Sequence, residues 1–164
     1  MKARLDLPEA YARALVILLD RVPVREIPWA VTGSAGMRLQ GMDLPVHDLD
    51  IQTRGAAAGL IERRLAEFVT TPLHPWETEC MHSLDGRFVI AGVEVELLAD
   101  VVHRMPDGSW VAFTDLARLV WLDWNGRGVP VFPLADEAEA YASMGRLEKA
   151  DRIRAFLAER DRAM

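Results

Sequence analysis

Two segments in which acidic and apolar residues alternate constrain the fold of this chain more than any other feature. One runs from Val46 to Thr53 and the other from Val93 to Leu98. Their acidic residues are Asp48, Asp50, Glu94 and Glu96. Successive side chains of a β-strand point to opposite faces of its sheet. We therefore predict two strands, each with an apolar face in the core and an acidic face directed away from it.

The remaining periodicity predicts a mixed α/β (α+β) chain. Apolar residues recur at helical spacing in residues 8–22, 56–69, 136–144 and 147–160, and a short helix is expected to begin near residues 37–40. Further short strands are expected at residues 29–32, 88–90, 110–113, 119–124 and 129–132. Ala91-Gly92 and Asn125-Gly126 are typical of tight hairpins, and Pro130 and Pro133 favour an edge position for the last strand. The hairpins imply a partly antiparallel sheet.

Length and composition limit the class of protein. With 164 residues, we expect one domain over residues 1–164, with a core at 29–98 and a helical segment at 136–160. The formal net charge of −6 disfavours a bare nucleic-acid partner. The single cysteine, Cys80, cannot form an internal disulfide, which is consistent with a reducing, cytoplasmic location. No apolar run is long enough to cross a membrane.

The acidic faces predict a metal site. Asp48 and Asp50 would lie on one face of a strand, roughly 6.6 Å apart along it. Two neighbouring carboxylates repel each other, and burial makes each anion costly, so a cation between them would stabilise both. Hard oxygen ligands of this kind suit Mg²⁺, with water and phosphate oxygens completing the octahedron. The alternative for an isolated Asp-x-Asp pair is two solvated residues at a sheet edge.

Gly33-Ser34 lies between a predicted buried strand and a predicted short helix. Backbone N–H groups at such a junction can bind a phosphate, and the missing Cβ of Gly33 allows close approach. A Gly-Ser pair alone is usually a simple turn. It gains weight here because the Asp-x-Asp segment follows 14 residues later.

Together these residues resemble the nucleotidyltransferase superfamily. The pattern is an apolar strand, Gly-Ser, a short helix, a strand with Asp-x-Asp, and a later strand with one more acid between apolar residues. It is most similar to the small, single-domain bacterial members of the size of the lincosamide and aminoglycoside nucleotidyltransferases. Tyr141, Gly145-Arg146 and Lys149-Ala150-Asp151 add a weaker resemblance at the C-terminal end.

The resemblance implies a mixed β-sheet flanked by helices, with the active site on one sheet face. It also implies transfer of a nucleoside monophosphate from an NTP to an acceptor hydroxyl, with release of pyrophosphate. In this sequence Gly33 and Ser34 would hold the triphosphate, Asp48 and Asp50 would bind Mg²⁺ (or Mn²⁺), and Glu96 would be the third carboxylate, as metal ligand or base. The third acid is often Asp in this superfamily, and the longer Glu reaches further.

Two further sets of residues have competing interpretations. Glu96 is favoured over Glu94 as the third acid because Glu94 lies next to the predicted turn, whereas Val95 and Leu97 anchor Glu96 in the sheet. Arg146 and Lys149 share a helix face. They either capture the leaving pyrophosphate, with Arg152 extending the patch, or form an ordinary solvated basic face.

Other chemistry is less well supported by the sequence. His74, Cys80 and His82 match no standard zinc spacing, and His47 is expected to pack or to support the site. One of five tryptophans could stack a nucleotide base, although most are expected in the core or on hairpin faces. The leading function is a Mg²⁺-dependent nucleotidyltransferase acting on a small molecule. The alternatives are the same chemistry on tRNA or protein, and a non-catalytic binding module.

Overall fold

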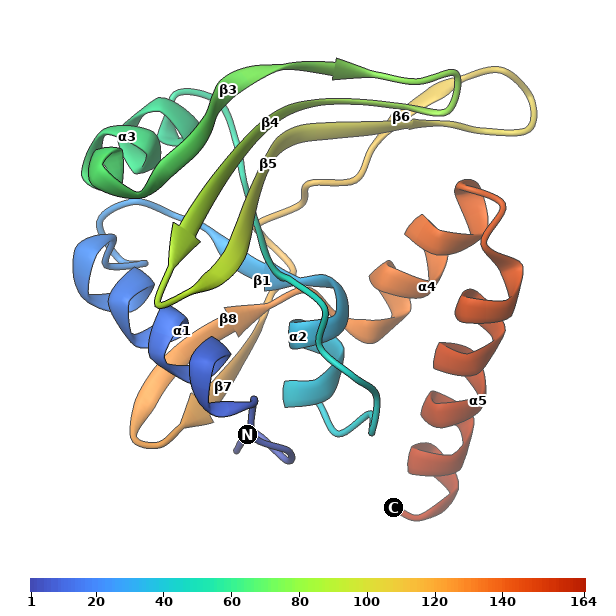
Figure 1. Ribbon diagram of the computed structural model, residues 1–164. Coiled ribbons are helices and arrows are strands. Elements are labelled where there is room, and N and C mark those ends of the chain that lie inside the picture. The colour runs from blue at the N-terminus through green and yellow to red at the C-terminus, as the bar shows by residue number, and fades with distance from the viewer.

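A computed structural model describes residues 1–164 of the chain (Figure 1). One mixed sheet of eight strands is flanked by helices, with strand order β3-β4-β5-β2-β1-β8-β7 and β6 paired to β5. The strands are β1 Ala30–Thr32, β2 Leu49–Thr53, β3 Val69–Glu77, β4 Met81–Ile90, β5 Val93–Arg104, β6 Trp110–Ala112, β7 Val120–Trp124 and β8 Arg127–Val131. The α/β prediction, with its partly antiparallel sheet, is confirmed.

The helices pack into two apolar clusters, and α2 contributes to both. Their bounds are α1 Glu9–Arg21, α2 Gly33–Leu39, α3 Ala57–Arg64, α4 Leu134–Ser143 and α5 Leu147–Arg162. The larger cluster joins α1 and α3 to the apolar faces of β2 and β5, including Leu15, Ile51, Ile61 and Val95. The smaller cluster joins α2 to α4 and α5, which lie side by side at the C-terminal end of the chain (Figure 1).

The hairpin turns follow the sequence closely. Ala91 and Gly92, between β4 and β5, have φ of 52° and 79°. Asn125 and Gly126, between β7 and β8, have φ of 53° and 82°. Positive φ at both central residues is the requirement of the two-residue turn that matches strand twist, so both predicted hairpins are confirmed.

Two of the predicted helix boundaries are wrong. The helix expected at residues 56–69 ends at Arg64, and β3 begins at Val69 after a short 3₁₀ turn. Pairing with β4 draws the following residues into the sheet, and Pro72 and Pro75 are tolerated because β3 is an edge strand. The helix expected near residue 37 instead begins at Gly33, directly after β1.

The predicted edge position of the last strand is also wrong. β8 lies between β1 and β7, and β7 forms the edge. The one register pair between β1 and β8 joins Val31 to Val131. Because the β1 ladder does not extend to Pro130, the missing N–H of that proline costs no hydrogen bond to β1.

No helix of the chain combines the length and apolar character needed to cross a bilayer.

Candidate active site

A row of polar side chains crosses the sheet at the C-terminal end of β1. Antiparallel pairing sets Thr32 opposite Asp50, and parallel pairing sets Asp50 beside Glu96. Arg87 of β4 is in turn opposite Glu96. Residues in register on adjacent strands point to the same face, so these four side chains lie on one face, opposite the apolar core. Two of the three carboxylates predicted from the sequence are therefore neighbours.

Asp48 lies at the entrance to this row. The sequence placed it within a strand, but β2 begins one residue later, at Leu49. Asp48 is half-buried, and its negative charge contributes to raising the pKa of both Asp50 and Glu96. Asp48 is therefore close enough to act electrostatically on both acids, although only Asp50 is held in place by strand pairing.

Asp50 is the most perturbed acid of the row. Burial, assisted by the charges of Glu96 and Asp48, raises its pKa to about 8. Its Oδ1 is buried and has no hydrogen-bond partner. Lys149 is the cation that opposes this shift. A buried carboxylate oxygen without a partner among like charges is the environment in which a bound cation gives most stabilisation.

The two glutamates of β5 differ in their surroundings. The Glu94 side chain is 44% exposed and accepts a 2.8 Å hydrogen bond from Nη1 of Arg87. The Glu96 side chain is 22% exposed, and Nη2 of Arg87 lies 4.0 Å from its Oε2. Burial, followed by the negative charge of Asp85, raises the pKa of Glu96 to about 7. The structure thus brings Glu96, and not Glu94, into register with Asp50.

Sequence reasoning missed two buried acids close to this row. Asp85 of β4 is 4% exposed, its Oδ1 has no partner, and burial raises its pKa. Asp85 lies two positions before Arg87, so both side chains point to the same face of β4. The predicted strand began at Phe88, and extending its alternation towards the N-terminus would have identified Asp85. Glu137 of α4 is 7% exposed, and burial raises its pKa. No local pattern distinguishes it from other acids in the first turn of a helix.

Gly33 links α2 to the acidic row. It has φ of 67°, and a Cβ at this position would lie 2.7 Å from Oδ2 of Asp50. Glycine is therefore required both by the backbone conformation and by the close approach of the carboxylate. Its N–H, expected to face a phosphate, instead donates to Oε1 of Glu137 at 3.1 Å. Ser34 is buried, and its Oγ accepts a 3.4 Å hydrogen bond from the N–H of His47.

The predicted cations lie beside the same site. Nζ of Lys149 lies 4.6 Å from the centre of the Tyr141 ring, and the guanidinium of Arg146 lies 5.0 Å from it. Burial and the charge of Arg146 lower the pKa of Lys149, while the charges of Glu137 and Asp50 oppose this. A hollow of about 560 Å³ is lined by Gly145, Arg146, Leu147, Glu148, Lys149 and Arg152. A cationic hollow thus adjoins the acidic row.

The carboxylates fit a metal that shares its coordination with substrate. No group of three or more histidine, cysteine or acidic side chains gathers closely enough to enclose a metal. Magnesium usually takes only one or two carboxylates and completes its shell with water and phosphate oxygens. The unpartnered Oδ1 of Asp50, with Asp48 nearby, meets that requirement.

The other sequence candidates lie elsewhere. His47 is exposed, so its side chain does not pack as expected, and its backbone N–H donates to Oγ of Ser34. Cys80 is exposed, His82 stacks on Trp110, and Nδ1 of His74 lies 3.0 Å from the carbonyl oxygen of Pro72. Of the tryptophans, Trp29 and Trp124 are buried and Trp76, Trp110 and Trp121 are exposed.

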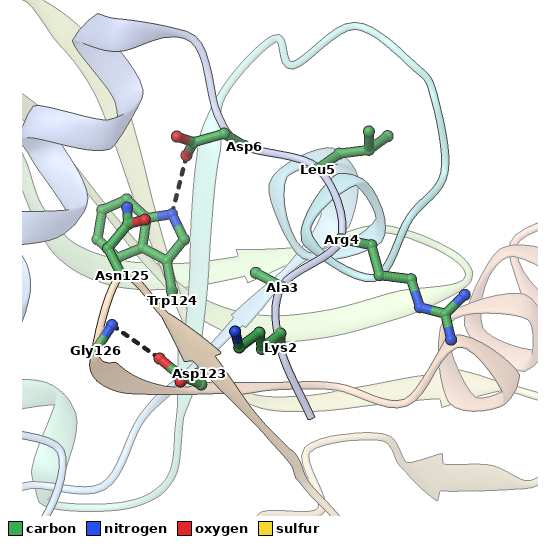
Figure 2. Close-up of a pocket in the computed structure, with 9 residues that line it drawn as sticks. All are labelled: Lys2, Ala3, Arg4, Leu5, Asp6, Asp123, Trp124, Asn125 and Gly126. Carbon is green, nitrogen blue, oxygen red and sulfur yellow. Dashed lines mark hydrogen bonds between the residues drawn. The ribbon is translucent and has the colours of Figure 1, made fainter.

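A second hollow lies between the N-terminal segment and the β7–β8 turn (Figure 2). It measures about 360 Å³ and is lined by residues 2–6 and 123–126. Figure 2 shows two hydrogen bonds between its lining residues: Nε1 of Trp124 donates to Asp6 at 3.0 Å, and the Gly126 N–H donates to Asp123 at 2.8 Å. None of the predicted site residues lines this hollow.

Comparisons with known proteins agree with the fold. A sequence model of the aminoglycoside-2''-adenylyltransferase family matches residues 14–156. The chain is also similar to a crystal structure of a Thermotoga maritima protein provisionally assigned as a nucleotidyltransferase, with 36% sequence identity and a TM-score of 0.80. That match covers 94% of this chain and 97% of the other. No curated protein sequence matches the chain.

Proposed function

Since this chain belongs to the aminoglycoside-2''-adenylyltransferase family and is a nucleotidyltransferase, we propose that it uses Mg²⁺ to transfer a nucleoside monophosphate from an NTP to a hydroxyl of a small molecule. The main evidence for a bound metal is the environment of Asp50. Its buried Oδ1 has no partner, and its pKa is raised to about 8 by burial and by neighbouring carboxylates. A divalent cation at this position would offset all of these charges at once.

Each residue of the site has a distinct part in this proposal. Asp50 and Asp48 would hold the metal, with Glu96 at its side, and Mn²⁺ would be an alternative ion. When bound, the metal neutralises charge on the phosphates. Gly33 permits the close approach of α2 to Asp50. With the Gly33 N–H engaged by Glu137, the contacts from this turn to the triphosphate would fall to Ser34.

The cations at the N-terminal end of α5, with Arg146 directly before it, would bind the part of the triphosphate that leaves. Lys149 interacts with Asp50, and Arg146 and Arg152 line the adjoining hollow. As the acceptor oxygen bonds to the α-phosphorus, the bond to the pyrophosphate oxygen breaks and negative charge accumulates on pyrophosphate. Fixed positive charges beside that group stabilise the transition state. The function of these residues is thus positioning and charge neutralisation.

Glu96 would accept the proton of the attacking hydroxyl. Its pKa of about 7 is close to the value at which a general base works best at neutral pH. It is partly exposed, so an acceptor can reach it, and it is in register with Asp50. Arg87 of the neighbouring strand lies 4.0 Å from it and would limit the reorientation of the carboxylate.

The acceptor is proposed to be a small polar molecule carrying hydroxyl groups, of the aminoglycoside class that the family's name indicates. The net charge of −6 favours such an acceptor over RNA. A cytoplasmic location, consistent with the free thiol of Cys80, belongs to the same proposal.

The test begins with the nucleotide, because it does not require the acceptor. Isothermal titration with α,β-methylene-ATP, which cannot release pyrophosphate, should show binding in Mg²⁺ and much weaker binding in EDTA. Asp50→Asn should abolish the dependence on Mg²⁺, and Asp123→Asn, near the end of β7 beside the other hollow, should not. Equal affinity with and without the metal would refute the metal site.

Mass spectrometry would then test the transfer. Incubation with ATP, Mg²⁺ and a panel of hydroxylated small molecules, tRNA and proteins should add one adenylyl group to a small molecule. Modification of tRNA or protein alone would refute the proposed acceptor class while preserving the chemistry.

A further inference from the structure

Glu137 makes the contacts that join the C-terminal helices to the nucleotide site. Its Oε1 accepts hydrogen bonds from the Gly33 N–H at 3.1 Å and from Oγ1 of Thr32. These bonds cross more than 100 residues of sequence, from the first turn of α4 to the junction of β1 and α2. Glu137 itself is 7% exposed, so the bonds are shielded from water and more costly to break.

Both residues that Glu137 holds lie directly against Asp50. Thr32 is the register partner of Asp50 on β1. Gly33 approaches so closely that a Cβ would lie 2.7 Å from Oδ2 of the same carboxylate. Oγ1 of Thr32 also lies 3.4 Å from the amide nitrogen of Gln52, the next residue of β2 on that face. The bonds of Glu137 therefore fix the backbone that forms one wall of the Asp50 site.

Electrostatics alone would not place an acid here. Glu137 adds another negative charge near Asp50 and contributes to raising its pKa. A carboxylate in this position opposes the approach of a triphosphate, so its value to the site must lie in the bonds it accepts. Lys149 lies close enough to offset part of the charge of both Glu137 and Asp50.

We propose that Glu137 is a positioning residue for nucleotide binding, which holds Thr32 and Gly33 so that Asp50 and Ser34 keep the geometry required by metal and triphosphate. This inference rests on the proposed function. When a residue that orients the ligands of a metal is removed, the affinity for the metal typically falls by about 10–100-fold.

Calorimetric titration of the full chain with α,β-methylene-ATP in the presence of Mg²⁺ tests this role. Glu137→Ala should weaken nucleotide binding about 10–100-fold. Glu137→Gln should bind within about threefold of the parent, because its amide oxygen can accept the same two hydrogen bonds. Glu139→Ala, which changes an exposed acid of the same helix, should bind like the parent.

The sign of the effect separates positioning from the two simpler roles. If Glu137 acted only through its charge, both substitutions would strengthen binding of the anionic nucleotide. If it acted only in folding, Glu137→Ala would lower the melting temperature, and the folded fraction would bind with unchanged affinity. Either result would overturn the inference.

A second variant keeps the test decisive if Glu137→Ala fails to fold. Thr32→Val is nearly isosteric and removes the hydroxyl that donates to Glu137 while leaving the Gly33 bond. It should weaken nucleotide binding by about 3–10-fold, and unchanged affinity would overturn the inference. If the parent itself shows no Mg²⁺-dependent nucleotide binding, the proposed function fails first, so the two failures are distinguishable.

Discussion

Replacing Asp50 by Asn should stabilise the metal-free protein, and the gain should grow with pH. The pKa of Asp50 rises from 3.8 to about 8 on folding. Between these values the folded chain holds a proton that the unfolded chain releases, so the free energy of unfolding falls as the pH rises. At about 1.4 kcal/mol per pH unit, the cost of burying this acid is about 4 kcal/mol at pH 7.

The substitution should recover part of that cost. The Asn amide is uncharged, but in the same site it lacks partners, which costs about 1–3 kcal/mol. A net gain of about 1–3 kcal/mol at pH 7 is therefore expected. Glu96, with its pKa of about 7, adds a slope of the same sign to both proteins, so the informative quantity is the difference between their stabilities.

Urea unfolding in EDTA at pH 5, 6 and 7 measures this difference. It should widen by about 1.4 kcal/mol for each pH unit, because in this range Asp50 is protonated in the folded parent and ionised in the unfolded parent, whereas the variant has no such group. Excess Mg²⁺ should stabilise the parent and leave Asp50→Asn unchanged. A constant difference across this pH range would refute the account of Asp50 as an uncompensated buried acid.

Three further predictions test the neighbouring residues. Gly33→Ala should lower the free energy of unfolding more than Gly55→Ala, since both have positive φ but only the first adds a Cβ 2.7 Å from a carboxylate oxygen; equal losses by chemical denaturation would contradict the close approach. In a transfer assay with an identified acceptor, Glu96→Gln should reduce turnover by about 10²–10⁴-fold and largely preserve nucleotide binding, whereas Glu94→Gln should have little effect; the reverse order would assign the base to Glu94. Lys149→Ala should weaken calorimetric binding of α,β-methylene-ATP by about tenfold or more, and parent-like affinity would make the cation part of the scaffold.

The local order of the fold could be predicted because its signals are local. Positive-φ pairs such as Asn125-Gly126 fix the hairpins, and the alternation around Asp50 and Glu96 indicates which side of each strand is buried. The boundary at Arg64 could not be predicted, because the residues after it join the sheet only through their pairing with β4. The interior position of β8 depends likewise on its pairing with β1.

The sequence by itself determined which residue types could form a site: an acidic strand face around Asp50, a second around Glu96, and a glycine after the first buried strand. The two acidic faces follow from the two-residue period of a strand, and the glycine follows from its conformational freedom, so none of the three requires a distant contact. Only the tertiary structure decided that Asp50 is in register with Glu96 and that Glu137 engages Gly33. The register of two strands 40 or more residues apart, and the docking of α4, depend on how the whole apolar core packs. The pKa values that make these acids chemically distinctive arise from that same burial.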